Sequence, residues 1–343
     1  MKSERLKRLF PALALPMILS SAALKADVPN VVADIAPVHS LVSMVTKGVG
    51  EPQLLIPQNA SPHHYAMRPS EAKALQEANL VVYLGHDLTP WLEPLFETVA
   101  ASAEALDLSE VDGVLQLPYR EGPVFGDHEG HDHEEESHDD HDDHEGHDHE
   151  EEGHDDHDDH EGHDDHAHHD HDGSDPHMWL DPANALVWLD AIASELGHID
   201  PENAARYRAN ANTAKEDISH EIHHIEDHLK SVQGQGFLVF HDAYQYFENR
   251  FGIFATGSIS IGDASKPSPK RLQQLKHHFE AEGIHCVLSE PQFSSKLIDS
   301  VFGGFKPHIG VVDPIGVDLE LGSGLYLELL ENMALGIAQC VNH

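Results

Sequence analysis

Histidines at three separate points of the chain are the residues whose type best suits metal chemistry. His63 lies in the segment SPHHYAMRPS, His177 lies in DPHMWLDP, and His241 ends the apolar run GFLVFH. Neutral imidazoles, completed by one carboxylate or water, are ligands that tetrahedral Zn²⁺ prefers. A single histidine at a strand end is more often only hydrogen-bonded, so the chemistry depends on whether the fold brings the three together.

The elements that must position these histidines alternate between short apolar strands and helices. We expect strands at 31–34, 53–56, 80–84, 237–240, 253–255, 285–288 and 309–313, and helices at 37–45, 70–78, 182–197, 201–230, 270–281 and 325–341. Ser70, Asp181 and Asp200 stand where helix caps are expected. This alternation predicts an α/β fold with mostly parallel sheets covered on both faces. Two such blocks around long helices predict two lobes with a cleft between them.

Ligands of open α/β sheets bind beyond the carboxyl ends of the strands. His241 ends one predicted strand, and His63 lies in the loop 57–65 that follows another. Asp313 closes the segment IGVVDPIG and is a fourth candidate by the same argument. The strand ends therefore predict a metal site in the cleft.

The N-terminus has the composition of a secretory signal. Four cations among the first eight residues precede a short apolar run at 9–19, and small residues then lead to Ala26. This order is typical of a signal peptide, and the run is too short for a membrane span. We expect cleavage near Ala26 and export to the periplasm. No later stretch has the length and apolar character of a span.

The acidity of the chain is concentrated in one insert at 127–172. The formal charge of −41 falls to −17 without the 24 Asp and Glu residues of this segment, which contains no Lys or Arg. Such a charge argues against nucleic acid or an anionic membrane as partner and favours cations.

Half of the histidines of the chain also lie in this insert, where they alternate with Asp and Glu. They are His128, His131, His133, His138, His141, His144, His147, His149, His154, His157, His160, His163, His166, His168, His169 and His171. A segment with no apolar residue larger than alanine cannot offset its ordering entropy, so we expect disorder. Histidine-rich tracts bind metals, and we predict an accessory zinc reservoir here.

Five segments carry a resemblance to a known family. SPHHYAMRPS, DPHMWLDP, FLVFHDAYQYFENRFG, SEPQFS and VVDPIGVDLELG occur in this order and resemble the zinc-uptake periplasmic binding proteins of the ZnuA type. The resemblance covers nearly the whole mature chain except the insert. It implies two (β/α)₄ lobes joined by a rigid long helix, with the metal between the lobes. It also implies that His63, His177 and His241 bind the metal.

The same resemblance bears on the remaining ligands. Some members have an acidic residue directly before the first ligand, and Pro62 excludes such a ligand here. Manganese-binding relatives have a carboxylate in place of His241, and a third imidazole shifts the preference towards Zn²⁺. Asp313 or water remains open as the fourth ligand.

The only two cysteines of the chain are Cys286 and Cys340. An even pair in an exported protein indicates one disulfide, with two buried thiols as the alternative. The pair also matches a disulfide found in some members of the family that the chain resembles.

A domain plan and a function follow from these observations. We expect a signal peptide at 1–26, an N-terminal lobe at 27–183, a linking helix at 184–198 and a C-terminal lobe at 199–343. We predict a monomeric periplasmic protein that captures Zn²⁺ and delivers it to an inner-membrane ABC permease. A periplasmic zinc store or chaperone is one alternative.

A zinc hydrolase is the second alternative, although the sequence lacks HExxH. Glu290, in SEPQF, is the residue that could serve such an enzyme as a general base, and a structural role is the other interpretation. A separate histidine cluster at 220–228 contains two pairs spaced by four residues, which could chelate a metal on one helix face. We interpret that cluster as a solvated polar face.

Overall fold

The computed structural model describes residues 28–120, 122–125, 173–260, 267–291, 302 and 307–343. The predicted signal peptide and the histidine-rich insert lie outside these residues. Among the described helices, none combines the length and the apolar character that crossing a bilayer requires.

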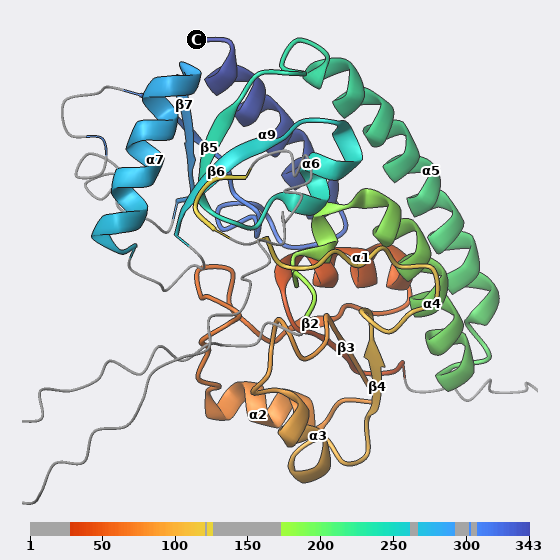
Figure 1. The fold of residues 1–343 in the computed structure, drawn as a ribbon. Helices are drawn as coiled ribbons and strands as arrows, with labels where there is room; N and C mark the ends of the chain where they lie inside the picture. The colour runs from red at the N-terminus through yellow and green to blue at the C-terminus, as the bar shows by residue number, and fades with distance from the viewer. Residues whose placement is uncertain (1–27, 121, 126–172, 261–266, 292–301, 303–306) are drawn as a thin grey trace, which may run out of the picture.

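Two parallel sheets form the centre of the molecule (Figure 1). The first has the order β2-β1-β3-β4 and consists of β1 (Val31–Ala33), β2 (Gln53–Leu54), β3 (Leu80–Tyr83) and β4 (Glu104–Asp107). The second has the order β6-β5-β7-β8 and consists of β5 (Phe237–His241), β6 (Ala255–Ser260), β7 (Cys286–Ser289) and β8 (His308–Val311). All neighbouring strands run parallel, which confirms the predicted α/β class with two lobes.

Helices cover these sheets and connect them. They are α1 (Ala36–Thr46), α2 (Pro69–Gln76), α3 (Glu93–Thr98), the 3₁₀ turn η1 (Met178–Leu180), α4 (Pro182–Ile199), α5 (Ala204–Leu229), α6 (Gln245–Phe251), α7 (Pro269–Glu282) and α9 (Leu325–Val341). Strands β1, β3 and β5 are buried along their whole length, as their continuous apolar sequences predict.

The longest helix, α5, lies along both halves of the molecule (Figure 1). It packs against α1 beside the first sheet, against α9 beside the second sheet, and against α4. Apolar residues such as Tyr207, Ile218 and Ile225 recur along one side of α5 and are fully buried. This helical layer belongs to the larger of the two hydrophobic clusters and holds the two sheets together.

One of the two predicted aspartate caps is correct. Asp181 caps α4, and its side chain accepts a hydrogen bond from the N–H of Ala183 at 2.9 Å. Asp200 does not cap α5, which begins only at Ala204. The carboxylate of Asp200 instead accepts a hydrogen bond from the hydroxyl of Tyr207, one turn into the helix, at 2.9 Å.

Four further elements differ from the prediction in position or were missed. α2 begins at Pro69, so Ser70 lies inside its first turn instead of capping it. The predicted strand 253–255 ended at Ala255, but β6 begins there. The small and polar residues that follow Ala255 are mostly buried and form the strand. The prediction missed α3 and β4, and β4 lacks the apolar run that marks a buried strand.

A crossing segment, residues 117–125 without the undescribed residue 121, leads from the first sheet to the second. Val124 forms an antiparallel bridge with Gly257 of β6. A β-carbon at Gly257 would lie 2.4 Å from the carbonyl oxygen of Pro123, so a larger residue there would push the segment away. Phe125, the last described residue before the predicted insert, therefore lies next to the edge of the second sheet.

Candidate metal centre

The fold brings together the three histidines that the sequence singled out. His63, His177 and His241 each offer one ring nitrogen, and these nitrogens all lie within 4.8 Å of one another. The ring centroids of His177 and His241 are 5.0 Å apart, and that of His63 lies 5.5 and 6.4 Å from them. Because His63 follows β2 and His241 ends β5, the histidine triad joins the two lobes.

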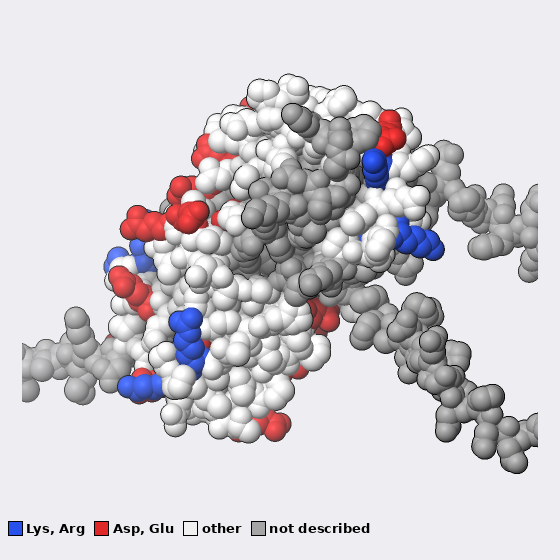
Figure 2. All heavy atoms as spheres, turned by 90° about the vertical axis from the view of Figure 1, so that its left-hand side faces the viewer, with Lys and Arg blue, Asp and Glu red and all other residues white. Residues whose placement is uncertain are grey.

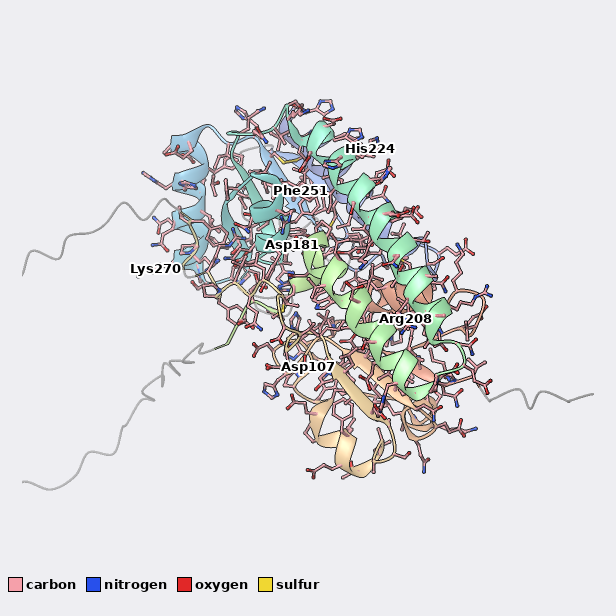
Figure 3. All side chains as sticks on the ribbon, turned by 90° about the vertical axis from the view of Figure 1, so that its right-hand side faces the viewer. Asp107, Asp181, Arg208, His224, Phe251 and Lys270 are labelled. Atoms are coloured by element: carbon pink, nitrogen blue, oxygen red, sulfur yellow. A yellow bond between two sulfur atoms is a disulfide. The ribbon has the colours of Figure 1, made fainter. Side chains whose placement is uncertain are left out.

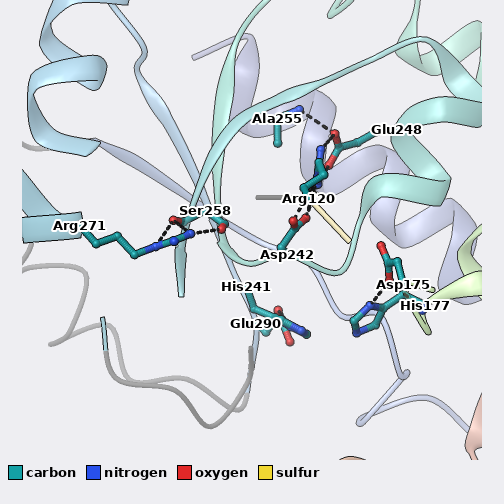
Figure 4. Close-up of polar contacts among 10 residues, drawn as sticks. All are labelled: Arg120, Asp175, His177, His241, Asp242, Glu248, Ala255, Ser258, Arg271 and Glu290. Atoms are coloured by element: carbon teal, nitrogen blue, oxygen red, sulfur yellow. Dashed lines mark hydrogen bonds and ion pairs between the residues drawn. The ribbon is translucent and has the colours of Figure 1, made fainter. Parts of the chain in front are cut away.

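His177 is oriented by a carboxylate two residues before it. Oδ1 of Asp175 accepts hydrogen bonds from the backbone N–H of His177 at 3.0 Å and from its Nδ1 at 2.7 Å (Figure 4). When Nδ1 carries the proton, the lone pair of Nε2 is available to bind a metal. Burial raises the pKa of Asp175 to about 7, and its hydrogen bond to His177 and the charge of Arg120 oppose this rise.

His241 has a similar partner on the neighbouring strand. Its Nδ1 lies 3.1 Å from Oε1 of Glu290, and both side chains are buried. The pairing of β5 with β7 explains this contact, since Leu238 lies opposite Val287 and the same offset continues to His241 and Glu290. Glu290 thus fixes the ring of His241 with Nε2 available to a ligand.

His63 lies on a loop that both lobes hold. The carbonyl of Pro62 accepts a hydrogen bond from the indole N–H of Trp91 at 3.0 Å. On the same loop, the side-chain amide of Gln58 donates to the carbonyls of Gly316 and Leu319, which follow the second sheet. These contacts place His63, the most exposed of the three histidines, against the other two.

Asp313 has a different set of contacts. Its carboxylate accepts hydrogen bonds from the backbone N–H groups of Ile315, Gly316 and Val317 at 3.1, 2.9 and 2.5 Å. The turn that these bonds form carries the carbonyl of Gly316 to which Gln58 donates. Asp313 does not join the triad within 4.8 Å, and no other described carboxylate does so.

A buried arginine connects the crossing segment with the end of β5. The guanidinium of Arg120 donates to both carboxylate oxygens of Asp242 and, through Nη1, to Glu248 at 2.7 Å (Figure 4). Asp242 directly follows His241. Arg120 also lies over the ring of Phe125, 4.0 Å from its centroid. The residues that lead to the insert are thereby tied to the strand that carries His241.

The other histidines that the sequence offers near the strand ends have different environments. The side chain of His86 is exposed and pairs with Glu93 at 3.2 Å, and His64 is exposed. His39 is buried in α1, where its Nε2 contacts the carbonyl of Pro52 at 3.0 Å and burial lowers its pKa. None of these three belongs to the described metal cluster.

The predicted disulfide is present. Cys286 and Cys340 are bonded, which joins the first residue of β7 to the last turn of α9. Because Glu290 follows the opposite end of β7, the disulfide stabilises the far side of the second lobe and does not contact the triad.

Charged side chains of both signs are spread over the face shown in Figure 2. Acidic groups gather along the upper left of this face, basic groups lie on its right and lower parts, and its described atoms form no large basic patch. The insert at 127–172 contributes 24 acidic residues and no Lys or Arg to the formal charge of −41.

The triad has the donor types and the approximate size of a zinc site. Nitrogens at about 2.0–2.1 Å from a tetrahedral ion lie roughly 3.3 Å from one another. The three ring nitrogens lie within 4.8 Å of one another. Each ring therefore needs to move inward by only about 1 Å or less to reach this geometry. Two α/β lobes, each built on a parallel sheet, with such a triad between them define the class of metal-binding solute-binding proteins.

Comparisons with known proteins identify the family within this class. The family model described as the periplasmic component A of zinc-uptake complexes, ZnuA, matches residues 31–340. The chain is 39% identical over 339 residues to the high-affinity zinc uptake system protein ZnuA of Brucella suis, with 99% of each chain covered. It is 41% identical to the protein of the same name from Paracoccus denitrificans, with 96% and 98% covered. The chain belongs to the ZnuA family.

Solved structures share the fold at lower identity. A crystal structure of ZnuA superposes with a TM-score of 0.67 at 21% identity, covering 92% of this chain and 99% of the other. The solute-binding protein FpvC from Pseudomonas aeruginosa, solved with Mn²⁺, gives a TM-score of 0.70 at 18% identity, covering 92% and 99%. The likeness to both structures is one of fold.

Sequence reasoning missed the residues that orient the triad. Asp175 stands two residues before His177, and this short spacing could have indicated the pair. Glu290 was noted as a conceivable general base or a structural residue, without His241 as its partner, and Arg120 was not noted at all. Their partners lie 49 and 122 residues away in the sequence, so only the fold reveals them.

Proposed function

We propose that the chain is the periplasmic zinc-binding component of an ABC importer. It captures Zn²⁺ with His63, His177 and His241 and delivers the ion to an inner-membrane permease. The observation that carries this proposal is the convergence of three imidazoles from two lobes within 4.8 Å. The names of the relatives, which refer to high-affinity zinc uptake, support it.

Three imidazoles favour Zn²⁺ over Mn²⁺, because nitrogen donors suit zinc and manganese prefers oxygen. Two of them are backed by buried carboxylates, which increase the basicity of the bound ring. Since the backbone holds the oxygens of Asp313, we propose water as the fourth ligand. Such an open position allows the ion to be released to the permease.

Delivery requires that the permease distinguishes loaded from empty protein. Because the ligands belong to both lobes, a bound ion favours one arrangement of the lobes over others. Helix α5, which packs on both sides, limits the size of this change. We therefore propose a small closing movement about the triad, and a monomer is sufficient for it.

The experiment is a zinc titration of protein that lacks residues 127–172, competed with a chromophoric chelator. The parent is expected to bind one Zn²⁺ tightly and to prefer it to Mn²⁺. His63→Ala and His241→Ala are expected to abolish tight binding, and His86→Ala serves as the exposed control. Unchanged affinity in the two triad variants would sink the assignment.

Two alternative functions have distinct signatures. A zinc store or chaperone would bind the ion equally well, but a deletion strain would grow normally at low zinc. A zinc hydrolase would turn over ester, peptide or phosphate substrates. Glu290, its conceivable base, contacts Nδ1 of His241 at 3.1 Å, which favours the positioning role. Growth that fails at low zinc and recovers with excess zinc would favour transport.

A further inference from the structure

His177 lies between the two sheets in the sequence, and helix α6 of the second lobe holds the residue that orients it. The hydroxyl of Tyr246 donates to the carbonyl of Asp175 at 2.9 Å and accepts from the backbone N–H of Leu117 at 2.8 Å. The N–H of Asp175 in turn donates to the carbonyl of Leu117 at 2.8 Å. Because Tyr246 is fully buried, its hydroxyl holds these two partners without competition from solvent. Helix α6 thus fixes the backbone of Asp175.

The neighbouring residue of α6 holds the carboxylate of Asp175. The side-chain amide of Gln245 has two acceptors at 3.1 Å, Oδ2 of Asp175 and the carbonyl of Pro118, so its nitrogen is assigned to that side and donates to both. Oδ1 of the same carboxylate accepts from the N–H and from Nδ1 of His177. The two oxygens therefore have separate partners, because α6 holds one and the other orients the metal ligand.

The residues that follow His177 also contact the second lobe. The indole N–H of Trp179 donates to the carbonyl of Pro314, beyond β8, at 2.7 Å. The carbonyl of Trp179 accepts from the hydroxyl of Tyr326 on α9 at 2.6 Å. His177 is thus held from the second lobe on both of its sides in the chain.

An ion pair extends these contacts to the start of α4. Arg250 of α6 donates to both carboxylate oxygens of Asp181, at 2.6 and 2.8 Å, and Asp181 is fully buried. Figure 3 shows Asp181 below Phe251, the residue that follows Arg250. The stretch from residue 175 to residue 181 is therefore fastened to α6 at both of its ends.

His63 differs from the other two ligands in burial and in distance. His177 and His241 are 4% and 5% exposed, whereas His63 is half-buried. The ring centroids of His177 and His241 are 5.0 Å apart, and that of His63 lies 6.4 Å from His241. Buried carboxylates, those of Asp175 and Glu290, contact Nδ1 of His177 and of His241. Two ligands are thus oriented on one side of the site, and the third approaches them from the loop after β2.

We propose that Gln245 and Tyr246 are positioning residues for zinc binding. They act through Asp175 on His177, so that His177 and His241 form a pair fixed to the second lobe. Closure of the lobes then brings His63 to this pair and completes the site. This proposal rests on the function proposed above and assigns its closing movement to one ligand.

Two conservative variants remove the hydrogen bonds of α6 to Asp175. Tyr246→Phe and Gln245→Met should each lower the zinc affinity of the full-length protein about tenfold, the smaller of the losses expected when the support of a ligand is removed. Tyr207→Phe is the matched control, because Tyr207 is also fully buried and its hydroxyl also bonds an aspartate, Asp200, but on α5. Chelator competition measures the tight site, and urea denaturation measures the stability of each variant.

Co²⁺ bound in place of Zn²⁺ separates positioning from a general loss of stability. Its d–d absorption depends on the geometry of the donors, so both α6 variants should change the spectrum and Tyr207→Phe should not. A double variant tests the route through the carboxylate. In Asp175→Ala, Gln245→Met should lower the affinity no further, because the acceptor of its hydrogen bond is already gone.

Metal-free protein tests the fixed pair. Diethyl pyrocarbonate should modify His63 faster than His177 and His241, as peptide mass spectrometry can follow. Tyr246→Phe and Gln245→Met should raise the rate at His177 and leave the rate at His63 unchanged.

Each measurement has an outcome that contradicts the proposal. Parent-like affinity and spectrum in both α6 variants, or an equal change in Tyr207→Phe, would overturn the positioning role alone. An undiminished effect of Gln245→Met in Asp175→Ala, or equal modification of the three histidines, would overturn it as well. Tight binding that persists in His241→Ala would overturn the proposed function, and this proposal with it.

Discussion

Glu290 lies beside His241 because β5 and β7 are paired in parallel with a constant offset of 49 residues. The same offset brings Oε1 of Glu290 to 3.1 Å from Nδ1 of the ring. A buried carboxylate at this distance holds the proton on Nδ1 and directs Nε2 to the metal. The register of the second sheet thus sets the orientation of one ligand.

Removal of this carboxylate is expected to weaken zinc binding while the triad remains present. Glu290→Ala should lower the zinc affinity by about 10–100-fold, the usual cost of losing such a partner. Glu290→Gln, which retains an acceptor oxygen, should lose less. Chelator competition measures both, with the exposed Glu280→Gln as the control. Equal affinities in all three variants would show that Glu290 does not position His241.

Arg120 neutralises two carboxylates that the fold buries, Asp242 and Glu248. Arg120→Met should destabilise the protein by about 3–5 kcal/mol, because it leaves buried charge without a partner. Urea denaturation measures this loss. Arg208→Met, an exposed change on α5, is the matched control and should stay within about 0.5 kcal/mol. A loss no larger than that of the control would contradict the role given to the arginine.

Asp34 is expected to make stability depend on pH. The residue is fully buried at the end of β1, and burial raises its pKa from 3.8 to about 7, against hydrogen bonds from Ile35 and Leu84. Between these values the folded state holds a proton that the unfolded state has lost, so stability falls as pH rises from about 4 to 7.

Asp34→Asn removes this titration, and its stability relative to the parent should rise across the same interval by at most about 4 kcal/mol. Urea denaturation of metal-free protein at several pH values measures the difference between the two proteins. A constant difference at all pH values would mean that Asp34 titrates normally.

The disulfide is expected to stabilise the second lobe without affecting the metal. Cys286 and Cys340 are 54 residues apart, and closing a loop of this length stabilises a fold by about 4 kcal/mol. Cys286→Ala with Cys340→Ala should therefore lower the midpoint of urea unfolding. The number of tightly bound zinc ions should stay the same. Loss of tight binding in folded protein would show that the disulfide also shapes the site.

Deletion of residues 127–172 should separate the weak zinc sites from the tight one. The 16 histidines of this insert are expected to bind several further ions in the full-length protein. These extra ions should dissociate below about pH 6.5, where imidazole is protonated. Equilibrium dialysis against ⁶⁵Zn²⁺ at several pH values measures both proteins. Equal stoichiometry with and without the insert would leave it without a role in metal binding.

Much of the architecture could be predicted from local patterns. The apolar runs of β1, β3, β5 and β7 and the periodicity of α9 gave elements within one or two residues of their observed bounds. β4 was missed because its residues are not apolar, and β6 was displaced because small residues form most of it. Local sequence thus identified the elements that carry apolar runs. It did not identify strands such as β4, whose place depends on pairing with neighbouring strands.

The sequence by itself determined the donor types at His63, His177 and His241 and placed each at the end of a strand or in a loop. Only the tertiary structure decided that the three nitrogens lie within 4.8 Å of one another. It also decided that the Asp313 carboxylate binds backbone N–H groups. The physical reason is that local propensity acts over a few residues. Contacts across 49 or more residues depend on strand register and on the packing of the two lobes.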